Sequence, residues 1–552
     1  MTKTMKYLSM AALAMVGIVM TGCSSDDSMT AEPQQPENKS NVVTLTTTVS
    51  MDGATTRAVT EGGVKTFKAG DRIAIIYKNG INETTRAVSN ELTSLDLVDG
   101  GKGAKITVTL SYPRAGTVRF VYPASMTVET PTTSADVTAD ENINMSALAT
   151  QDGSLSTIGD NYDLCYGDGT LTTSGDDYTL PSNVTLLNKL AIGKFTIKNS
   201  ATSSDITSTV TTLYIKNGSD TYTVTPSSSL SAIWVAMKPI SSGDIVINAA
   251  VGKDIFKKTV SGTTISSKPL VANTINPITV TVIKVEGALS GLFTVNSSGK
   301  QVYFSQGNLQ YIGTKGNDDE NNTGAWWCFA TNQWDHITDQ YREGKQVDRD
   351  LFGWGTSGYN HGATRYQPWS TGSGNTDYYA YGNSVYNLYD SDGTADWGYN
   401  AIMNGGNTEN SGWRTPTRDE WEYMRFSRTT PSGILFAKAS VNGKNGVIFL
   451  PDNWNTSYHS LSNTNVSSSS FSSNSINKSD WENDFEAHGA VFLPATGARY
   501  GTSVQSDGEV LCWSASKYWE YNSYSMNFSN TGYGDNCYRN WGLTVRLVRD
   551  AE

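Results

Sequence analysis

Residues 194–198, Lys-Phe-Thr-Ile-Lys, alternate polar and apolar side chains and decide the fold class of the first half of the chain. A side-chain period of two is typical of a β-strand with one buried and one exposed face. Residues 106–110 and 118–122 alternate in the same way, and residues 42–49 mix apolar residues with threonine. Asn79-Gly80 and other Asn-Gly pairs favour tight hairpins between such strands. We therefore predict a mainly β chain whose first half forms sandwiches of antiparallel sheets.

The aromatic residues predict where the domains divide. Of the 14 tryptophans only Trp234 precedes residue 284, and all four histidines also lie beyond that point. We expect a first β-sandwich over residues 42–150, a second over 151–284 and a different domain over 288–552. The length of 552 residues agrees with about two to four domains. Only 17% of the residues are charged, the net charge is −12 and no basic stripe occurs, which argues against a nucleic-acid partner.

The N-terminal residues 1–22 read as an export signal. Lys3 and Lys6 precede an apolar run over residues 10–20, which is shorter than the about 20 residues needed to span a bilayer but suits a signal peptide. Residues 20–23, Met-Thr-Gly-Cys, resemble the lipobox of bacterial lipoproteins. This resemblance implies that Cys23 becomes a lipidated N-terminus anchored in the outer membrane. The alternative is an ordinary secretory signal beside a chance cysteine.

Residues 23–41 are polar and contain proline, so we expect a disordered tether. The acidic pair Asp26-Asp27 beside the cysteine resembles the export tag of surface lipoproteins in Gram-negative anaerobes. No later stretch is long and apolar enough to be a transmembrane helix, so lipid would be the anchor. The predicted location is the outer membrane, exposed at the cell surface.

Three segments of the first half resemble fimbrillin-family pilins, the subunits of type V pili. They are residues 67–75 (FKAGDRIAI), 163–167 (DLCYG) and 187–197 (LNKLAIGKFTI), in this order. The family implies that a trypsin-like protease cuts after an arginine near the first strand. Loss of that strand opens a groove for the donor strand of another pilin subunit. Arg57, followed by Ala58, lies at the matching place, although it is also readable as an ordinary loop arginine.

Four segments of the second half resemble the C-type-lectin-like superfamily, in the branch that contains formylglycine-generating-type domains. They are residues 413–423 (WRTPTRDEWEY), 493–499 (LPATGAR), 512–516 (CWSAS) and 543–549 (LTVRLVR). The resemblance implies an α+β domain rich in long loops, which is a scaffold and not a reaction. We expect a helix with Thr415 as its N-cap, and with Trp421 and Met424 on one face.

An enzymatic role is not expected for this second half. Formylglycine generators depend on two neighbouring cysteines, whereas Cys512 and Cys537 are far apart in sequence. Neither a G-x-S-x-G elbow nor an H-E-x-x-H helix occurs. Cys512 and Cys537 are instead candidates for a disulfide, with buried free thiols as the alternative.

Two further kinds of site are predicted in the second half. Asp390, Asp392 and Asp396 form an acidic loop that is a candidate calcium site, with a solvated loop as the alternative; no other cofactor is expected. The aromatic residues of a polar, glycine-rich stretch would offer exposed rings to a glycan or a protein ligand. These residues are Trp369, Tyr378, Tyr379 and Tyr381. Alternatively, their rings cover the core of the domain itself.

A pilin half followed by a lectin-like half is the order expected of a fimbrial tip adhesin. Residues 545–552 resemble the closing core strand of the lectin-like fold, so the subunit would accept a donor strand without giving one. After processing it would reside in the fimbrium and present its C-terminal domain to a host or bacterial ligand. Two alternatives are a non-polymerising outer-membrane lipoprotein that captures glycans and a degenerate formylglycine-generating-type enzyme.

Overall fold

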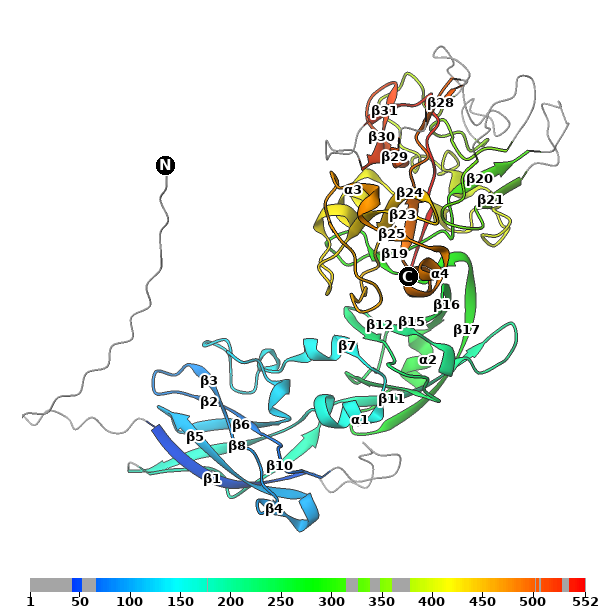
Figure 1. The fold of residues 1–552 in the computed structure, drawn as a ribbon. Helices are drawn as coiled ribbons and strands as arrows, with labels where there is room; N and C mark the ends of the chain where they lie inside the picture. Colours follow the sequence, from blue (N-terminus) through cyan, green and yellow to red (C-terminus); the bar gives the residue numbers. More distant parts are fainter. Residues whose placement is uncertain are drawn as a thin grey trace, which may run out of the picture.

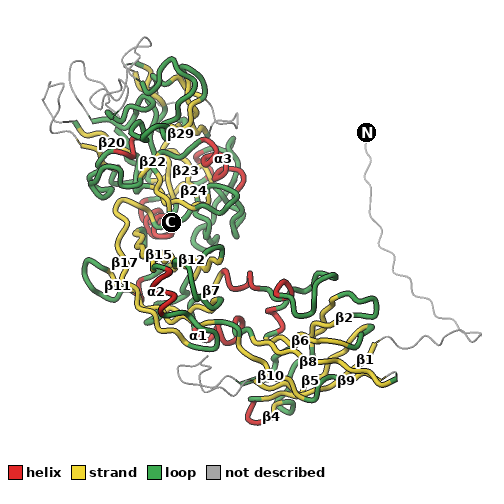
Figure 2. Tube along the Cα trace, turned by 180° about the vertical axis from the view of Figure 1, so that it is seen from behind, coloured by secondary structure: helices red, strands yellow, loops and turns green. Residues whose placement is uncertain are grey.

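The computed structural model describes residues 42–51, 66–175, 177–313, 326–337, 348–359, 378–501, 503–505, 508–528 and 536–551. These residues form three modules that follow each other from blue to red in Figure 1. Strands and loops predominate over short helices (Figure 2), so the prediction of a mainly β chain is confirmed. In this part of the chain, no helix has both the length and the apolar character needed to cross a membrane.

The first sandwich is a nine-stranded sheet within the described residues, and it folds back on itself. In sheet order its strands are β3 (Thr84–Val88), β2 (Ala74–Lys78), β6 (Gly116–Tyr122), β8 (Cys165–Ser174), β10 (Asn183–Asn188), β1 (Val42–Met51), β5 (Gly103–Ser111) and β4 (Leu97–Val98), with β9 (Asp177–Thr179) beside β8. The two ends of this path face one core, in which Ile75 and Phe120 meet Ile106 and Val108. The predicted alternating strands lie inside β5 and β6.

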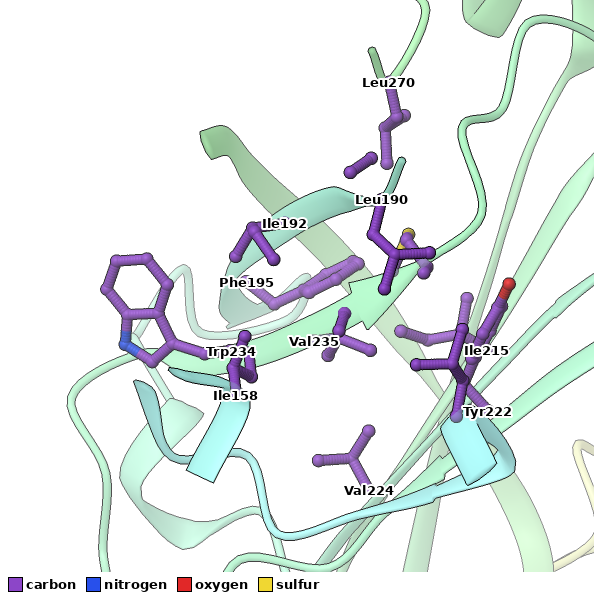
Figure 3. Close-up of a cluster of buried hydrophobic side chains, with 14 of the residues drawn as sticks. Ile158, Leu190, Ile192, Phe195, Ile215, Tyr222, Val224, Trp234, Val235 and Leu270 are labelled. Carbon is purple, nitrogen blue, oxygen red and sulfur yellow. The ribbon is translucent and has the colours of Figure 1, made fainter. Parts of the chain in front are cut away.

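The second sandwich is an eight-stranded sheet within the described residues. In order its strands are β14 (Ile233–Met237), β11 (Ala191–Asn199), β17 (Ile275–Leu289), β16 (Asp254–Val260), β15 (Ile245–Val251), β12 (Thr212–Asn217), β13 (Asp220–Val224) and β7 (Thr150–Gln151). The long strand β17 pairs with β11 over Ile275–Val282 and then with β16, so it closes the two layers. Figure 3 shows the core between the layers, where Phe195 and Val235 lie near Ile215 and Tyr222.

Two predictions about this half need correction. Both sheets contain parallel pairs, β1 with β10 and β11 with β17, so they are mixed and not purely antiparallel. The boundary expected after residue 150 is wrong, because the chain enters the second sheet at β7 and then returns to the first for β8, β9 and β10. The change of module comes between β10 and β11, after Asn188. The boundary expected near 284–288 falls inside β17.

The C-terminal module is built from five small sheets of the described residues, joined by long loops. The first is β18 (Phe293–Thr294), β19 (Gln301–Phe304), β32 (Val548–Asp550) and β22 (Trp413–Arg414), and the second is β20 (Leu309–Ile312) with β21 (Trp326–Phe329). The third is β25 (Ser475–Ile476), β23 (Phe436–Val441), β24 (Lys444–Phe449) and β26 (Val491–Pro494). The last two are β27 (Ala498–Tyr500) with β28 (Ser503–Gln505), and β29 (Leu511–Lys517), β30 (Asn522–Asn527) and β31 (Asn536–Tyr538).

Short helices complete the modules. They are α1 (Leu155–Thr157) and α2 (Gly262–Ser267) in the second sandwich, and α3 (Arg418–Glu422) and α4 (Lys478–Asp480) in the C-terminal module. The N-cap of α3 is Thr417, which forms a capping box with Glu420, and not Thr415 as predicted. Trp421 and Met424 are both buried in one cluster, as their spacing predicts.

Apolar clusters continue across both joints between the modules. Val121 and Met126 of the first sandwich share a cluster with Leu190 and Phe195 of the second. A different cluster joins Ile255 of the second sandwich to Leu292 and other residues of the C-terminal module. Each joint is therefore packed like a domain interior, and the three modules form one body.

Candidate functional site

Strand β1 is the element that the predicted strand exchange concerns, and it fills a groove in the first sandwich. It pairs antiparallel with β5 from Val42↔Ser111 to Ser50↔Gly103. From Thr48↔Asn183 to Met51↔Leu186 it also pairs in parallel with β10. The C-terminal half of β1 is thus an inner strand with a ladder on either side (Figure 1).

The sequence of β1 explains why it occupies this place. Its inward side chains become more buried along the strand, ending with Val49 at 0% and Met51 at 5% exposure. They join the core formed by β5 and β10 side chains such as Ile106 and Val184. On the outer face the hydroxyl oxygens of Thr44 and Thr109 lie 3.0 Å apart, within hydrogen-bond distance. Burying Val49 and Met51 contributes about 1.5–3 kcal/mol each.

Four predicted site residues lie outside the described part of the chain; they are Cys23, Arg57, Ala58 and Trp369. Lipidation, processing after Arg57 and ligand binding by Trp369 therefore stay predictions. The place of Arg57 in the sequence has one covalent consequence. Arg57 follows β1 and precedes the next described residue, Thr66, so a cut after it would leave β1 held only by its hydrogen bonds and packing.

The predicted exposed rings of Tyr378 and Tyr379 are not exposed. Each is only 2% accessible, and Tyr379 packs in the core of the C-terminal module, its ring centroid 5.9 Å from that of Trp354. Tyr381 is half-buried, with its ring centroid 5.3 Å from that of Tyr521. The prediction that the rings of Tyr378 and Tyr379 are exposed is therefore wrong, because both side chains are buried inside the module.

Exposed rings gather instead at the hairpin between β29 and β30. We call the side chains of Tyr518, Trp519, Tyr521 and Tyr538 the aromatic patch; Trp519 is the most exposed, at 64%. Residues 518–521, Tyr-Trp-Glu-Tyr, stand between two strands in the sequence, so a run of aromatic residues in a hairpin turn was the signal that could have found them. Large exposed apolar groups of this kind are typical of binding surfaces.

A buried arginine holds this hairpin in place. Arg539 donates through Nη1 to the carbonyl oxygens of Tyr379 (3.1 Å) and Ala380 (2.6 Å), and through Nη2 to that of Trp519 (2.8 Å). Its guanidinium carbon lies 4.6 Å from the centroid of the Trp354 ring. Burial lowers the pKa of Arg539 to about 10, which leaves it charged at neutral pH. The hairpin turn is thus tied to the core and presents its rings on a fixed backbone.

The three aspartates of the predicted calcium site do not form one. Asp390 Oδ2 accepts from the backbone N–H of Asn387 (2.6 Å), and Asp392 Oδ1 accepts from the backbone N–H of Thr394 (3.1 Å). Asp396 accepts hydrogen bonds from Gly398 and Thr415; burial nevertheless raises its pKa. Within the described ranges, no three His, Cys, Asp or Glu side chains are grouped to hold a metal ion. Asp390 and Asp392 instead fix local turns, and Asp396 joins its own turn to Thr415.

The predicted disulfide between Cys512 and Cys537 is absent, and both are buried free thiols. Cys512 lies on β29 and Cys537 on β31, with β30 between them. Strands two positions apart in a sheet are separated by about 9–10 Å, beyond the reach of a disulfide. The thiol of Cys512 lies 3.2 Å from Thr544 Oγ1, and burial raises its pKa to about 11.

Comparisons with known proteins return fimbrial proteins at low similarity. A fimbrial assembly protein of Parabacteroides distasonis is 10% identical, with a TM-score of 0.26, and the match covers 48% of this chain and 95% of that one. A fimbrial protein of Bacteroides ovatus is also 10% identical, with a TM-score of 0.22, over 93% of this chain and 99% of that one. The shaft pilin spaA of Lactobacillus rhamnosus GG is 12% identical, with a TM-score of 0.20, and the match covers 44% of this chain and 97% of that one. No family model and no curated protein matches the sequence.

Proposed function

We propose that the chain is a surface-exported pilus subunit, a tip adhesin that accepts a donor strand in its first sandwich and binds a ligand through its C-terminal half. The observation that carries the proposal is the place of β1 between β5 and β10. Removing β1 would leave backbone donors and acceptors unpaired on both neighbours, beside the apolar trench that held Val49 and Met51. A donor strand from another subunit would restore both the ladders and the burial.

The pairing of β32 supports a tip position. Its residues pair with β19 through Tyr303↔Arg549 and with β22 through Trp413↔Arg549. The carboxylate of Asp550 also receives hydrogen bonds from Arg414, with Nη2 at 2.8 Å. Lending this strand to a neighbour would break two ladders and this ion pair, so β32 is a poor donor strand. The subunit accepts a strand and ends a fibre.

We further propose that the C-terminal half binds a ligand and does not catalyse a reaction. The aromatic patch offers rigid rings on a turn that Arg539 anchors. Tyrosine and tryptophan rings suit glycan faces and protein surfaces alike, since they present an apolar body and a polar tip. The main alternative is a lipid-anchored surface protein that binds the same ligands and never polymerises.

The N-terminal sequence of the protein in shed fibres and in the outer membrane tests the proposal. We expect Ala58 at the start of the fibre form and a lipid-modified Cys23 at the start of the precursor. A start at Cys23 in both fractions would favour the anchored alternative. Detected turnover of a substrate by the purified protein would overturn the non-enzymatic role.

Processing at Arg57 is tested by a matched pair of substitutions. Arg57→Gln should prevent cleavage by a trypsin-like protease and keep the subunit out of fibres, because β1 then stays covalently attached. Arg114→Gln is the control, since Arg114 is an exposed arginine of the same sandwich that lies between β5 and β6. Fibres that incorporate the Arg57→Gln subunit at the normal level would exclude strand exchange triggered at this site.

A further inference from the structure

A pocket lies where the second sandwich meets the C-terminal module. Its volume is about 420 Å³, with β12, β13 and β15 on one side, and the β18–β19 hairpin with Ala551 on the other. A neighbouring pocket of about 430 Å³ shares Tyr214, Thr223 and Gln301 with it and continues toward Trp454 and Tyr458. Both volumes are in the range of small-molecule sites, about 300–1,000 Å³. Figure 1 and Figure 2 place β12 and β15 beside the C-terminal module at this joint.

The floor of the pocket is a row of side chains across three strands. Tyr214 on β12 is paired with Thr223 on β13 and with Asn248 on β15. Residues directly opposite in paired strands project from the same face of the sheet. The Thr223 hydroxyl, the Tyr214 ring and the Asn248 amide therefore all face the C-terminal module.

Asn248 is the unusual member of the row. It is 94% buried, since its exposed fraction is 6%, and it lines the pocket. Its side-chain Oδ1 has no hydrogen-bond partner among the described residues. Buried polar atoms are normally paired, and an unpaired one destabilises the fold. A ligand in the pocket would complete the hydrogen bonds of this amide.

The opposite wall is held rigidly. Asp452 Oδ2 accepts hydrogen bonds from Thr294 Oγ1 at 2.7 Å and from Gln301 Nε2 at 2.9 Å. Asp452 Oδ1 lies 2.9 Å from Nη1 of the buried Arg428, which neutralises the carboxylate. Gln301 and Thr294 thus have fixed positions before any ligand arrives, which lowers the entropy lost on binding.

The chemistry of the lining selects the class of ligand. Hydroxyls and amides, which both donate and accept hydrogen bonds, lie among the rings of Tyr214, Trp454 and Tyr458. Among its described residues, the lining contains one cation, the side chain of Lys216. It also contains one carboxylate, that of Asp452, which is already paired with Arg428. A sugar matches this combination, because it has apolar C–H faces and many hydroxyls but no charge.

We propose that this pocket binds a neutral saccharide, with the Asn248 and Gln301 amides on its hydroxyls and Tyr214 beside its ring. The pocket is a second binding site, separate from the aromatic patch. It rests on the adhesive function proposed above for its biological meaning. Strand acceptance takes place in the first sandwich, so an experiment can refute either proposal without refuting the other.

The full-length protein is tested on an array of neutral oligosaccharides printed beside sialylated and sulfated ones and a set of peptides. We expect neutral saccharides to bind. Asn248→Leu removes the amide with similar side-chain volume and should weaken binding by about tenfold or more. Thr223→Trp fills the space between both pockets and should abolish binding. Thr259→Leu is the control, because Thr259 is exposed on β16 outside the pocket and should leave binding unchanged.

Thermal unfolding separates a loss of binding from a loss of folding. Asn248→Leu should melt at the same or a higher temperature than the native protein, because it removes an unpaired buried polar atom. Loss of binding with an undiminished melting temperature supports the site. Binding that survives both pocket substitutions, or an array on which only charged glycans or peptides bind, would overturn it. Normal strand acceptance in the same variants would leave the proposed pilus function standing.

Discussion

At the scale of single residues, His488 connects the stability of the C-terminal module with pH. Its ring stacks on Tyr458 with centroids 3.7 Å apart, and its Nδ1 lies 3.1 Å from the backbone carbonyl oxygen of Asp484. Burial lowers the pKa of His488, against the opposing effect of Asp484. The unfolded chain therefore binds the proton more tightly, so stability is complete above the unfolded pKa, about 6.5, and falls as the pH drops through it.

We expect the melting temperature to fall between pH 7 and pH 5, and His488→Phe to reduce that fall. Phenylalanine keeps a ring against Tyr458 but has no proton to bind. Burial also lowers the pKa of His336, so part of the pH dependence should remain in the variant. Thermal unfolding followed by circular dichroism at several pH values measures the effect. Identical pH profiles for the native protein and the variant would contradict it.

The cysteines give a second residue-scale prediction. Cys512 and Cys537 should be unreactive toward a thiol reagent in the folded protein and react fully after denaturation, because both are buried free thiols. A reducing agent should leave the melting temperature unchanged. A drop of several degrees on reduction would show that a disulfide forms. The sequence could not decide this point, because spacing along the chain does not tell how many strands separate two residues in a sheet.

At the scale of elements, β1 should be replaceable by a peptide of its own sequence. After cleavage at Arg57 and removal of the cleaved β1 segment, a peptide of residues 42–51 should bind the first sandwich and raise its melting temperature. The same peptide with Val49→Asp should bind more weakly by about 3 kcal/mol or more, since the charge would enter the core beside Ile106. A Thr44→Asp peptide is the matched control, because Thr44 is exposed on the outer face. Equal affinity of all three peptides would exclude burial of β1 side chains as the source of binding.

Local patterns predicted the elements better than their connections. Alternation found β5, β6 and β11, and Asn217-Gly218 marked the hairpin between β12 and β13, because both signals act between near neighbours. The return of the chain to the first sheet at β8 depends on pairing between distant segments and left no local signal. The predicted N-cap of α3 was two residues too early, because Thr415 and Thr417 are equally suitable caps by residue type.

The candidate site was also predictable only where it depends on a local sequence pattern. The groove strand was predicted at residues 42–49 from their mixture of apolar residues and threonine, and β1 (Val42–Met51) confirms it. The row of Thr223, Tyr214 and Asn248 was not, since its members come from three strands and meet only through their register. Tyr378 and Tyr379 were predicted to be exposed because the composition around them is polar and rich in glycine. Composition describes the average of a segment, whereas the burial of one side chain depends on its own contacts.

At the scale of the whole molecule, two packed joints convert three modules into one body. A pair of glycines stands at the second joint, where Gly291 follows β17 and Gly489 follows the short helical turn at Glu486–His488. A Cβ on Gly291 would lie 2.1 Å from the carbonyl oxygen of Gly489, a distance that no packing can accommodate without a backbone shift. Gly489 also has φ +80°, which favours glycine. The joint therefore combines close backbone contact with apolar burial, and packed clusters link the first sandwich to the C-terminal module through the second.

This connection predicts that the second sandwich and the C-terminal module unfold together. Ile255 lies on β16 of the second sandwich, yet it is fully buried in the cluster that contains Leu292 and Trp397 of the C-terminal module. Ile255→Ala should cost about 2–5 kcal/mol and lower the unfolding midpoint of both modules. Tryptophan fluorescence reads mainly the C-terminal half, where 13 of the 14 tryptophans lie. Ile106→Ala is the matched control, since Ile106 is equally buried but belongs to the separate cluster inside the first sandwich. If the modules unfolded independently, Ile255→Ala and Ile106→Ala would give the same unfolding midpoint by fluorescence. A larger shift for Ile255→Ala shows that packing against the second sandwich stabilises the C-terminal module.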